Sequence, residues 1–141
     1  MTDFILDNRL ADSSASVMIC EAFDIRLVDD RRYFWALLIP QIPHITELSD
    51  LSDQARLTLL SLTSHLSAGL KDSCKADKMN IAMIGNVVSQ FHLHIVARHH
   101  TDESWPDPIW GKGTPLRLTD EERQHRSHII ETLCASWLAN R

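Results

Sequence analysis

The sequence predicts an α+β domain: a mainly antiparallel sheet of about five strands, one long helix packed on it and a second helix at the C-terminus. Three observations predict this class. Short apolar and β-branched runs occur in two groups, before position 40 and again over 78–98. Leucines at helical spacing separate the two groups. A helix start signal at position 119 opens the last part of the chain.

Three short runs in the first part of the chain predict strands: 16–20 (SVMIC), 24–29 (DIRLVD) and 34–39 (FWALLI). We expect the first two to form a hairpin. The charged residues 29–32 predict a turn before the third run. That run is almost wholly apolar and stops at Pro40, which is typical of a strand covered on both faces.

From Ser52 the apolar period changes to three or four residues, with Ser52 as a candidate N-cap. The leucines that carry this period are Leu59, Leu62, Leu66 and Leu70. They predict an amphipathic helix of about five turns. Residues 78–84 (KMNIAMI) then predict a strand, and 90–98 predict the next. Because the connection between these two is short, they should pair antiparallel.

A capping box predicts the last helix, because Thr119 and Glu122 have the Thr-x-x-Glu spacing. Ile129, Leu133 and Trp137 continue it as an apolar stripe at four-residue spacing. We expect the stripe to dock on the sheet or on a partner subunit. At 141 residues the chain has the size of one domain over 1–141, with a core over about 4–111 and the C-terminal helix over about 119–139.

Composition excludes several classes of function. The net charge is -5, with 14 basic and 19 acidic residues, so no positive field would attract long nucleic acid. Neither a signal peptide pattern nor an apolar run of roughly 18 residues is present, so we expect neither secretion nor membrane insertion. Cys20, Cys74 and Cys134 form no CxxC pair, which argues against a zinc knuckle or a disulfide framework. These features fit a cytoplasmic protein that acts on a small molecule.

The most informative run is QFHLHIVAR, at residues 90–98, in which polar and apolar residues alternate. In a strand, successive side chains point to opposite faces. Gln90, His92, His94 and Arg98 would therefore share one side of the strand. A core strand has no need of such a polar face, whereas a pocket that holds an anion and offers it a nucleophile does.

This run resembles the histidine triad (HIT) signature, His-φ-His-φ-His-φ-φ, with Gln90 in place of the first histidine. Other segments follow in HIT order: LLIP before a histidine-containing loop, a long helix, a strand ending in Gly-Asn, the triad strand and a Trp-rich segment. The resemblance covers roughly residues 4–111. The local form NVVSQFHLH, with WPDPIWG downstream, resembles a bacterial branch of HIT-like hydrolases in which glutamine stands first.

The resemblance implies a hydrolase or transferase that acts on a nucleotide phosphoanhydride or phosphoramidate, with dinucleoside polyphosphates among the candidate substrates. His92 would be the nucleophile and form a covalent nucleotidyl-histidine, since a neutral imidazole attacks phosphorus well. His94 would contact the phosphate on the side of the leaving group and, when protonated, stabilise developing charge. Gln90, at the first position of the triad, is the remaining candidate catalytic residue. Its amide could orient a neighbouring imidazole but cannot carry a proton.

Four more residues are candidate nucleotide or phosphate contacts. Asn86 lies where HIT proteins place an asparagine that binds the nucleotide, and His44 resembles a loop histidine behind the triad. Arg98 could donate to a phosphate oxygen. Trp110, like Trp105, could stack on a nucleobase, and packing on the core or at a dimer interface is the alternative.

Other interpretations stay open. The protein could be a catalytically weak nucleotide-binding or sensor protein of the same fold. The histidines could be buried residues without a ligand, or His92, His94, His99 and His100 could bind a metal, although no nearby cysteine or well-spaced carboxylate completes a tetrahedral site. The leading hypothesis requires no cofactor, and a polyphosphate substrate can arrive with magnesium. HIT-like proteins commonly dimerise, so we expect a homodimer.

Overall fold

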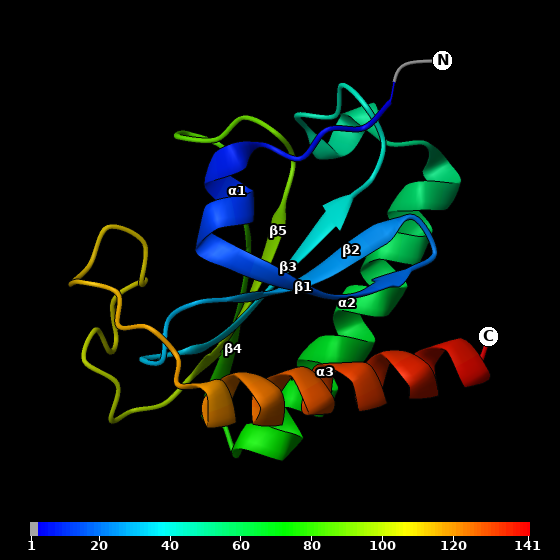
Figure 1. The fold of residues 1–141 in the computed structure, drawn as a ribbon. Helices are drawn as coiled ribbons and strands as arrows, with labels where there is room; N and C mark the ends of the chain where they lie inside the picture. The colour runs from blue at the N-terminus through cyan, green and yellow to red at the C-terminus, as the bar shows by residue number, and fades with distance from the viewer. Residues whose placement is uncertain (1–2) are drawn as a thin grey trace.

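The computed structural model describes residues 3–141, so the first two positions of the predicted domain lie outside the described residues. Five strands form one antiparallel sheet in the order β1-β2-β3-β5-β4 (Figure 1). The strands are β1 (Ser14–Cys20), β2 (Phe23–Val28), β3 (Phe34–Pro40), β4 (Lys78–Met83) and β5 (Leu93–Arg98). The helices are α1 (Asn8–Ser13), α2 (Asp53–Cys74) and α3 (Asp120–Ala139), with a short 3-10 turn at Leu48–Asp50. The predicted α+β class is confirmed.

The two faces of the sheet carry different layers. α2 and α3 cover one face, and the main core lies between them and the sheet. α1 packs on the other face, in a smaller apolar cluster that contains Leu10 of α1 with Leu37 and Ile39 of β3. Because side chains alternate along β5, Leu93 and Ile95 enter the main core, and the histidines point to the face that carries α1.

β5, which carries His94, begins later than predicted. Its ladder starts at Leu93, which pairs with Leu38 of β3 and Met83 of β4, rather than at Gln90. Before it, the Phe91 N–H donates to the carbonyl of Ile45, 2.9 Å away. His92 therefore lies at the end of the loop that enters the sheet, one residue before the ladder.

α2 follows the predicted pattern. The Ser52 side chain accepts the N–H of Ala55 as an N-cap. Four leucines of the helix have no exposed surface: Leu59, Leu62, Leu66 and Leu70. This helix supplies the apolar layer that supports β3 and β5 from below the site.

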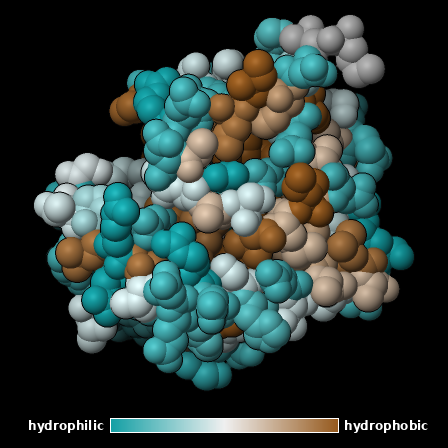
Figure 2. Space-filling view, in the orientation of Figure 1, coloured by the Kyte–Doolittle hydropathy of each residue, from teal (hydrophilic) through white to brown (hydrophobic). Residues whose placement is uncertain are grey.

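α3 begins at the predicted capping box, in which Glu122 N–H donates to Thr119 Oγ1 and Thr119 N–H donates to Glu122 Oε1. Its apolar stripe packs on the domain itself: Trp137 is buried and donates from Nε1 to Ser61 of α2. Figure 2 shows hydrophilic residues along the outer side of the first turns of α3. The sequence predicts that the stripe docks either on the sheet or on a partner subunit. In the structure it packs on the sheet and on α2 of its own chain, so it is not free for a second subunit.

Among the helices of residues 3–141, none combines the length and the apolarity that a membrane crossing requires.

Candidate active site

His92 and His94 lie side by side where β5 begins, with ring centroids 4.8 Å apart. Both are mostly buried, at 7% and 6% exposure. They line a hollow of about 470 Å³ between the sheet, α1 and the segment around Trp110, here named the histidine hollow. His92 also lines a second hollow of about 550 Å³ that contains Asn86, here named the Asn86 hollow. The nucleophile predicted from the sequence therefore borders two cavities.

The histidine hollow is lined by both apolar and charged residues. Its apolar and aromatic lining comes from Leu10, Val28, Trp35, Leu37, Val88 and Trp110. Its charged lining comes from Arg9, Asp12, Asp29, Asp30 and Arg117. Apolar walls with a few polar groups are typical of a pocket for a small organic ligand.

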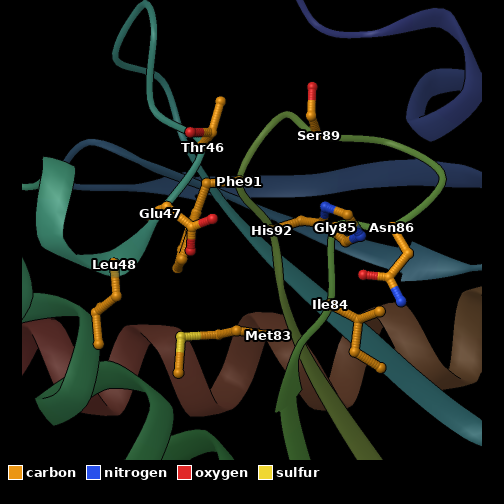
Figure 3. A pocket seen from close by; sticks show the side chains of 10 residues that line it. All are labelled: Thr46, Glu47, Leu48, Met83, Ile84, Gly85, Asn86, Ser89, Phe91 and His92. Atoms are coloured by element: carbon orange, nitrogen blue, oxygen red, sulfur yellow. The ribbon is translucent and has the colours of Figure 1, made fainter.

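The backbone fixes the proton on the His92 ring. His92 Nδ1 lies 2.7 Å from the carbonyl oxygen of Gln90. A carbonyl can only accept, so Nδ1 carries the hydrogen and Nε2 keeps its lone pair. Figure 3 shows the His92 ring beside Asn86, with Thr46 and Glu47 across the Asn86 hollow. A ring with a free Nε2 at the border of two hollows can act as a nucleophile.

His94 has the opposite arrangement of its nitrogens. The indole Nε1–H of Trp35 donates to His94 Nδ1 over 3.0 Å, and because an indole nitrogen is only a donor, Nδ1 must be unprotonated. The hydrogen of the neutral ring then lies on Nε2. Burial, and next the neighbouring His92, lower the pKa of His94 to about 3. This corrects the expectation of a protonated His94: the ring offers a neutral N–H donor instead.

The Gln90 side chain does not share the catalytic face. Its Oε1 accepts the N–H of Asp7 at 2.8 Å, and its Nε2 donates to the carbonyl of Ile5 at 2.9 Å. The group of Gln90 that touches the nucleophile is its backbone carbonyl. The expectation that its amide orients an imidazole is therefore corrected: the amide fastens the N-terminal segment, and the backbone orients His92.

The structure places two of the four candidate nucleotide contacts, Asn86 and Trp110, beside the catalytic histidines. Asn86 lines the Asn86 hollow with His92, and Trp110 lies edge-on to His94 with ring centroids 5.1 Å apart. His44 is exposed, has a positive φ of 65°, and lines a shallow hollow beside Gln90 without either histidine. Trp105 packs against His100 and is not brought to the site.

Arg98 is the candidate that the structure moves out of the site. It shares the histidine face of β5 but is only 1% exposed. Its guanidinium donates to both carboxylate oxygens of Asp102, to Asn80 Oδ1 and to the carbonyl of Asp107. The expectation that Arg98 binds phosphate is corrected, because these partners take up four of its five N–H donors and the side chain is buried.

The structure does not bring four histidines together around a metal. His99 Nε2 lies 3.0 Å from the carbonyl of Cys74, and His100 lies beside Asp77, both beyond the far end of β5. In residues 3–141 no group of three or more histidine, cysteine, aspartate or glutamate side chains is placed to hold a metal ion. The described residues thus give no support to the metal-binding alternative.

Sequence reasoning missed Trp35 and the N-terminal segment as parts of the site. Trp35 lies in the apolar run 34–39, which resembles core throughout. The available signal was its indole N–H, which needs a partner when a tryptophan is placed in a buried strand. α1 has only six residues, too few for a helical period to show in the sequence.

Comparisons with known proteins agree with the fold. The HIT domain family matches residues 18–101. A histidine triad protein from Sinorhizobium meliloti is 35% identical, with 92% of this chain and 96% of that chain covered and a TM-score of 0.89. One from Marinobacter aquaeolei is 32% identical, with 96% and 99% covered and a TM-score of 0.93. One from Bradyrhizobium japonicum is 32% identical, with 94% and 99% covered and a TM-score of 0.91.

The search of curated proteins found no match. The family match spans more than half of the chain, and the similar structures cover nearly all of it. Together with the paired histidines at the start of β5, these findings show that the chain belongs to the histidine triad family.

Proposed function

We propose that this protein is a nucleotidyl hydrolase or transferase of the HIT branch with glutamine at the first triad position. It would act on a nucleotide phosphoanhydride or phosphoramidate, with dinucleoside polyphosphates among its candidate substrates. The observation that carries the proposal is the hydrogen bond from His92 Nδ1 to the Gln90 carbonyl, which leaves the Nε2 lone pair free beside two hollows.

In the first step, the lone pair of His92 Nε2 attacks the phosphorus of the bound nucleotide. The bond from phosphorus to the leaving group breaks, and its electron pair departs with that group. The ring, which keeps its hydrogen on Nδ1, becomes positively charged. The Gln90 carbonyl, 2.7 Å away, stabilises this charge through a charge-assisted hydrogen bond.

In the second step, water or another acceptor attacks the phosphorus, and the electrons of the P–N bond return to His92 Nε2. The proton of the attacking water passes to solvent. The His94 Nε2–H is the donor placed to stabilise the charged phosphoryl oxygens in both steps, since its Nδ1 is already held by Trp35.

The two hollows give the substrate two places to extend from the phosphorus. The apolar and aromatic walls of the histidine hollow suit a nucleobase, and the Asp29 carboxylate in its lining suits the hydroxyl groups of a sugar. Asn86 and Ser89, which line the other hollow, offer neutral hydrogen bonds to phosphate oxygens. No resident cofactor is required, and magnesium would enter with a polyphosphate.

We also propose that the protein is cytoplasmic and forms a homodimer through the outer edge of β4. β4 is the last strand of the sheet, and its Ile81 and Met83 are 46% and 47% exposed. Leu57 and Leu60 of α2 are exposed as well. An open edge with exposed apolar residues favours pairing with a second chain. The mass in solution tests this: Ile81→Lys should give a monomer, and a monomeric unaltered protein would contradict the dimer.

The decisive experiment compares turnover by the unaltered protein, His92→Ala and His100→Ala. Adenylated and guanylated dinucleoside polyphosphates and phosphoramidates serve as substrates. His92→Ala should lose turnover of every substrate that the unaltered protein uses. His100 is exposed and lies away from both hollows, so His100→Ala should retain it. Equal turnover by His92→Ala and the unaltered protein would exclude the mechanism.

A slow or non-catalytic nucleotide-binding protein is the second candidate. One observation favours it: Gln90 is turned toward the N-terminal segment and His94 is neutral, so no side chain of the triad can release a proton to the leaving group. Tight nucleotide binding to the unaltered protein, with no nucleotidyl adduct on His92, would support this candidate.

A further inference from the structure

The His94 ring is enclosed by three aromatic neighbours. Trp35, from β3, donates its indole N–H to Nδ1, and the two ring centroids are 5.7 Å apart. Trp110 lies edge-on to His94 at 5.1 Å and to Trp35 at 6.3 Å. The His92 ring lies on a further side at 4.8 Å. Only the Nε2 edge of His94 is left for a ligand in the histidine hollow.

A second proton on His94 would have to sit on Nδ1. There it would meet the indole N–H of Trp35, so that two donors would face each other across 3.0 Å. The charged side chains that line the same hollow are Arg9, Asp12, Asp29, Asp30 and Arg117. None of their carboxylates is hydrogen-bonded to His94 within residues 3–141, so none is placed to accept a hydrogen bond from an imidazolium there. Burial and the neighbouring His92, which lower the pKa of His94, act in the same direction.

We propose that Trp35 is a positioning residue that holds His94 as a neutral Nε2–H donor, and that the site is therefore selective for leaving groups that depart as stable anions. Phosphoanhydrides have such leaving groups, and phosphoramidates of alkylamines do not. The inference rests on the proposed function, because it presumes attack by His92 on phosphorus.

The selectivity follows from which groups can supply a proton. His92 uses Nδ1–H for the Gln90 carbonyl and Nε2 for the phosphorus. The Gln90 amide is no acid, and Arg9 and Arg117 do not release protons. Four carboxyl side chains line the two hollows: Asp12, Asp29, Asp30 and Glu47. Among residues 3–141, none of them is hydrogen-bonded to either catalytic histidine. No further imidazole, thiol or ammonium group lines either hollow in the described part of the chain. The leaving group must therefore depart without a proton from the triad.

The two substrate classes differ at this step. In a phosphoanhydride, the P–O bond breaks and the electron pair stays on an oxygen of the departing phosphate, where the charge is shared with its other oxygens. In a phosphoramidate of an alkylamine, cleavage of the P–N bond would leave a nitrogen anion unless the nitrogen is first protonated. General acid catalysis contributes about 10²–10⁴-fold where it is available. We therefore expect kcat/KM for the anhydride to exceed that for the alkylamine phosphoramidate of the same nucleoside by at least about 100-fold.

The first test needs no variant. Nitrogen-15 NMR of the imidazole rings distinguishes protonated from unprotonated nitrogens. In the unaltered protein, His94 should show a bare Nδ1 and a protonated Nε2 throughout the range of about pH 5 to 8, in which an ordinary histidine titrates. A His94 ring that titrates within this range, or that carries its hydrogen on Nδ1, would overturn the inference.

The second test removes the donor while keeping an aromatic ring. In folded Trp35→Phe, His94 should titrate at higher pH than before, and at pH 5 to 6 the ratio of anhydride to phosphoramidate turnover should fall by about tenfold or more. Trp110→Phe is the matched control for the nitrogen signals, because it changes the neighbouring indole but leaves the Trp35 hydrogen bond in place. An unchanged ratio and an unchanged His94 titration in Trp35→Phe would contradict the role of Trp35.

Labelling of His92 by the two substrates distinguishes failure of the proposed function from failure of the inferred selectivity. If neither substrate labels His92, the proposed function fails. If His92 is labelled equally fast by the anhydride and by the phosphoramidate, the proposed function stands and the selectivity inferred from Trp35 is wrong.

Discussion

Replacing Arg98 by methionine would distinguish a structural arginine from a phosphate-binding one. The guanidinium makes four hydrogen bonds, two of them to Asp102. The ion pair is almost dry, with side-chain exposures of 2% for Arg98 and 6% for Asp102. Burial raises the pKa of Asp102, but hydrogen bonds from Arg98 and from backbone N–H groups outweigh it and lower the pKa below the usual value.

Arg98→Met keeps much of the apolar length of the side chain but leaves a buried carboxylate without its cation. Breaking a buried ion pair by removing one partner costs about 3–5 kcal/mol. Urea unfolding, followed by circular dichroism, measures this loss directly. Arg31→Met is the control, since Arg31 is half-exposed and 3.4 Å from Glu122, and such a surface pair contributes about 1 kcal/mol or less.

Two further results complete this test. The double variant Arg98→Met, Asp102→Asn should recover part of the lost stability, because no unpaired charge then remains buried. A loss below about 1 kcal/mol in Arg98→Met, with nucleotide binding abolished in the folded protein, would refute the structural role and restore the phosphate-binding one.

The remaining predictions concern the hydrogen bonds from Gln90 to the N-terminal segment, the N-cap of α3 and the pH dependence of stability. Gln90→Ala should lower the free energy of unfolding by about 1–3 kcal/mol, since two hydrogen bonds to the N-terminal segment are lost, and should still form the His92 adduct; loss of the adduct in the folded variant would contradict this. Thr119→Ala should cost about 1 kcal/mol in thermal unfolding through loss of the N-cap, and no change would argue against the capping box. The pKa of His94 is lowered to about 3 in the folded state, so the unfolded state binds more protons than the folded state below about pH 6.5. The free energy of unfolding should therefore fall as the pH decreases from about 6.5 toward 3. The expected slope is up to about 1.4 kcal/mol per pH unit. Urea titrations at several pH values should show a shallower fall in His94→Gln, and identical slopes in the two proteins would contradict a neutral His94.

Local patterns predicted most of the fold. The leucine period of α2, the Thr119 capping box and the alternation in β5 each depend on neighbours within a few positions, and all three are present in the structure. The pairing of His92 with His94 follows from the same alternation. A short period is readable in one sequence because the physical cause acts over one or two turns of the chain.

The parts of the site that were missed depend on contacts between distant segments. Gln90 is bonded to Asp7, 83 positions away, and Trp35 to His94, 59 positions away. The position of Arg98 on the triad face predicts a phosphate contact, but its guanidinium instead meets Asn80 on another strand and Asp102 in the following loop. No period in the sequence shows which donor meets which acceptor across the sheet, so tertiary contacts decided these three roles.

The most direct measurement of the central claim is the site of the covalent intermediate. The protein is mixed with a dinucleoside polyphosphate, quenched without acid, digested and analysed by tandem mass spectrometry. A nucleotidyl group attached to His92 is the predicted result. Rapid turnover with the label on another residue, or with no label at any time after mixing, would contradict the account.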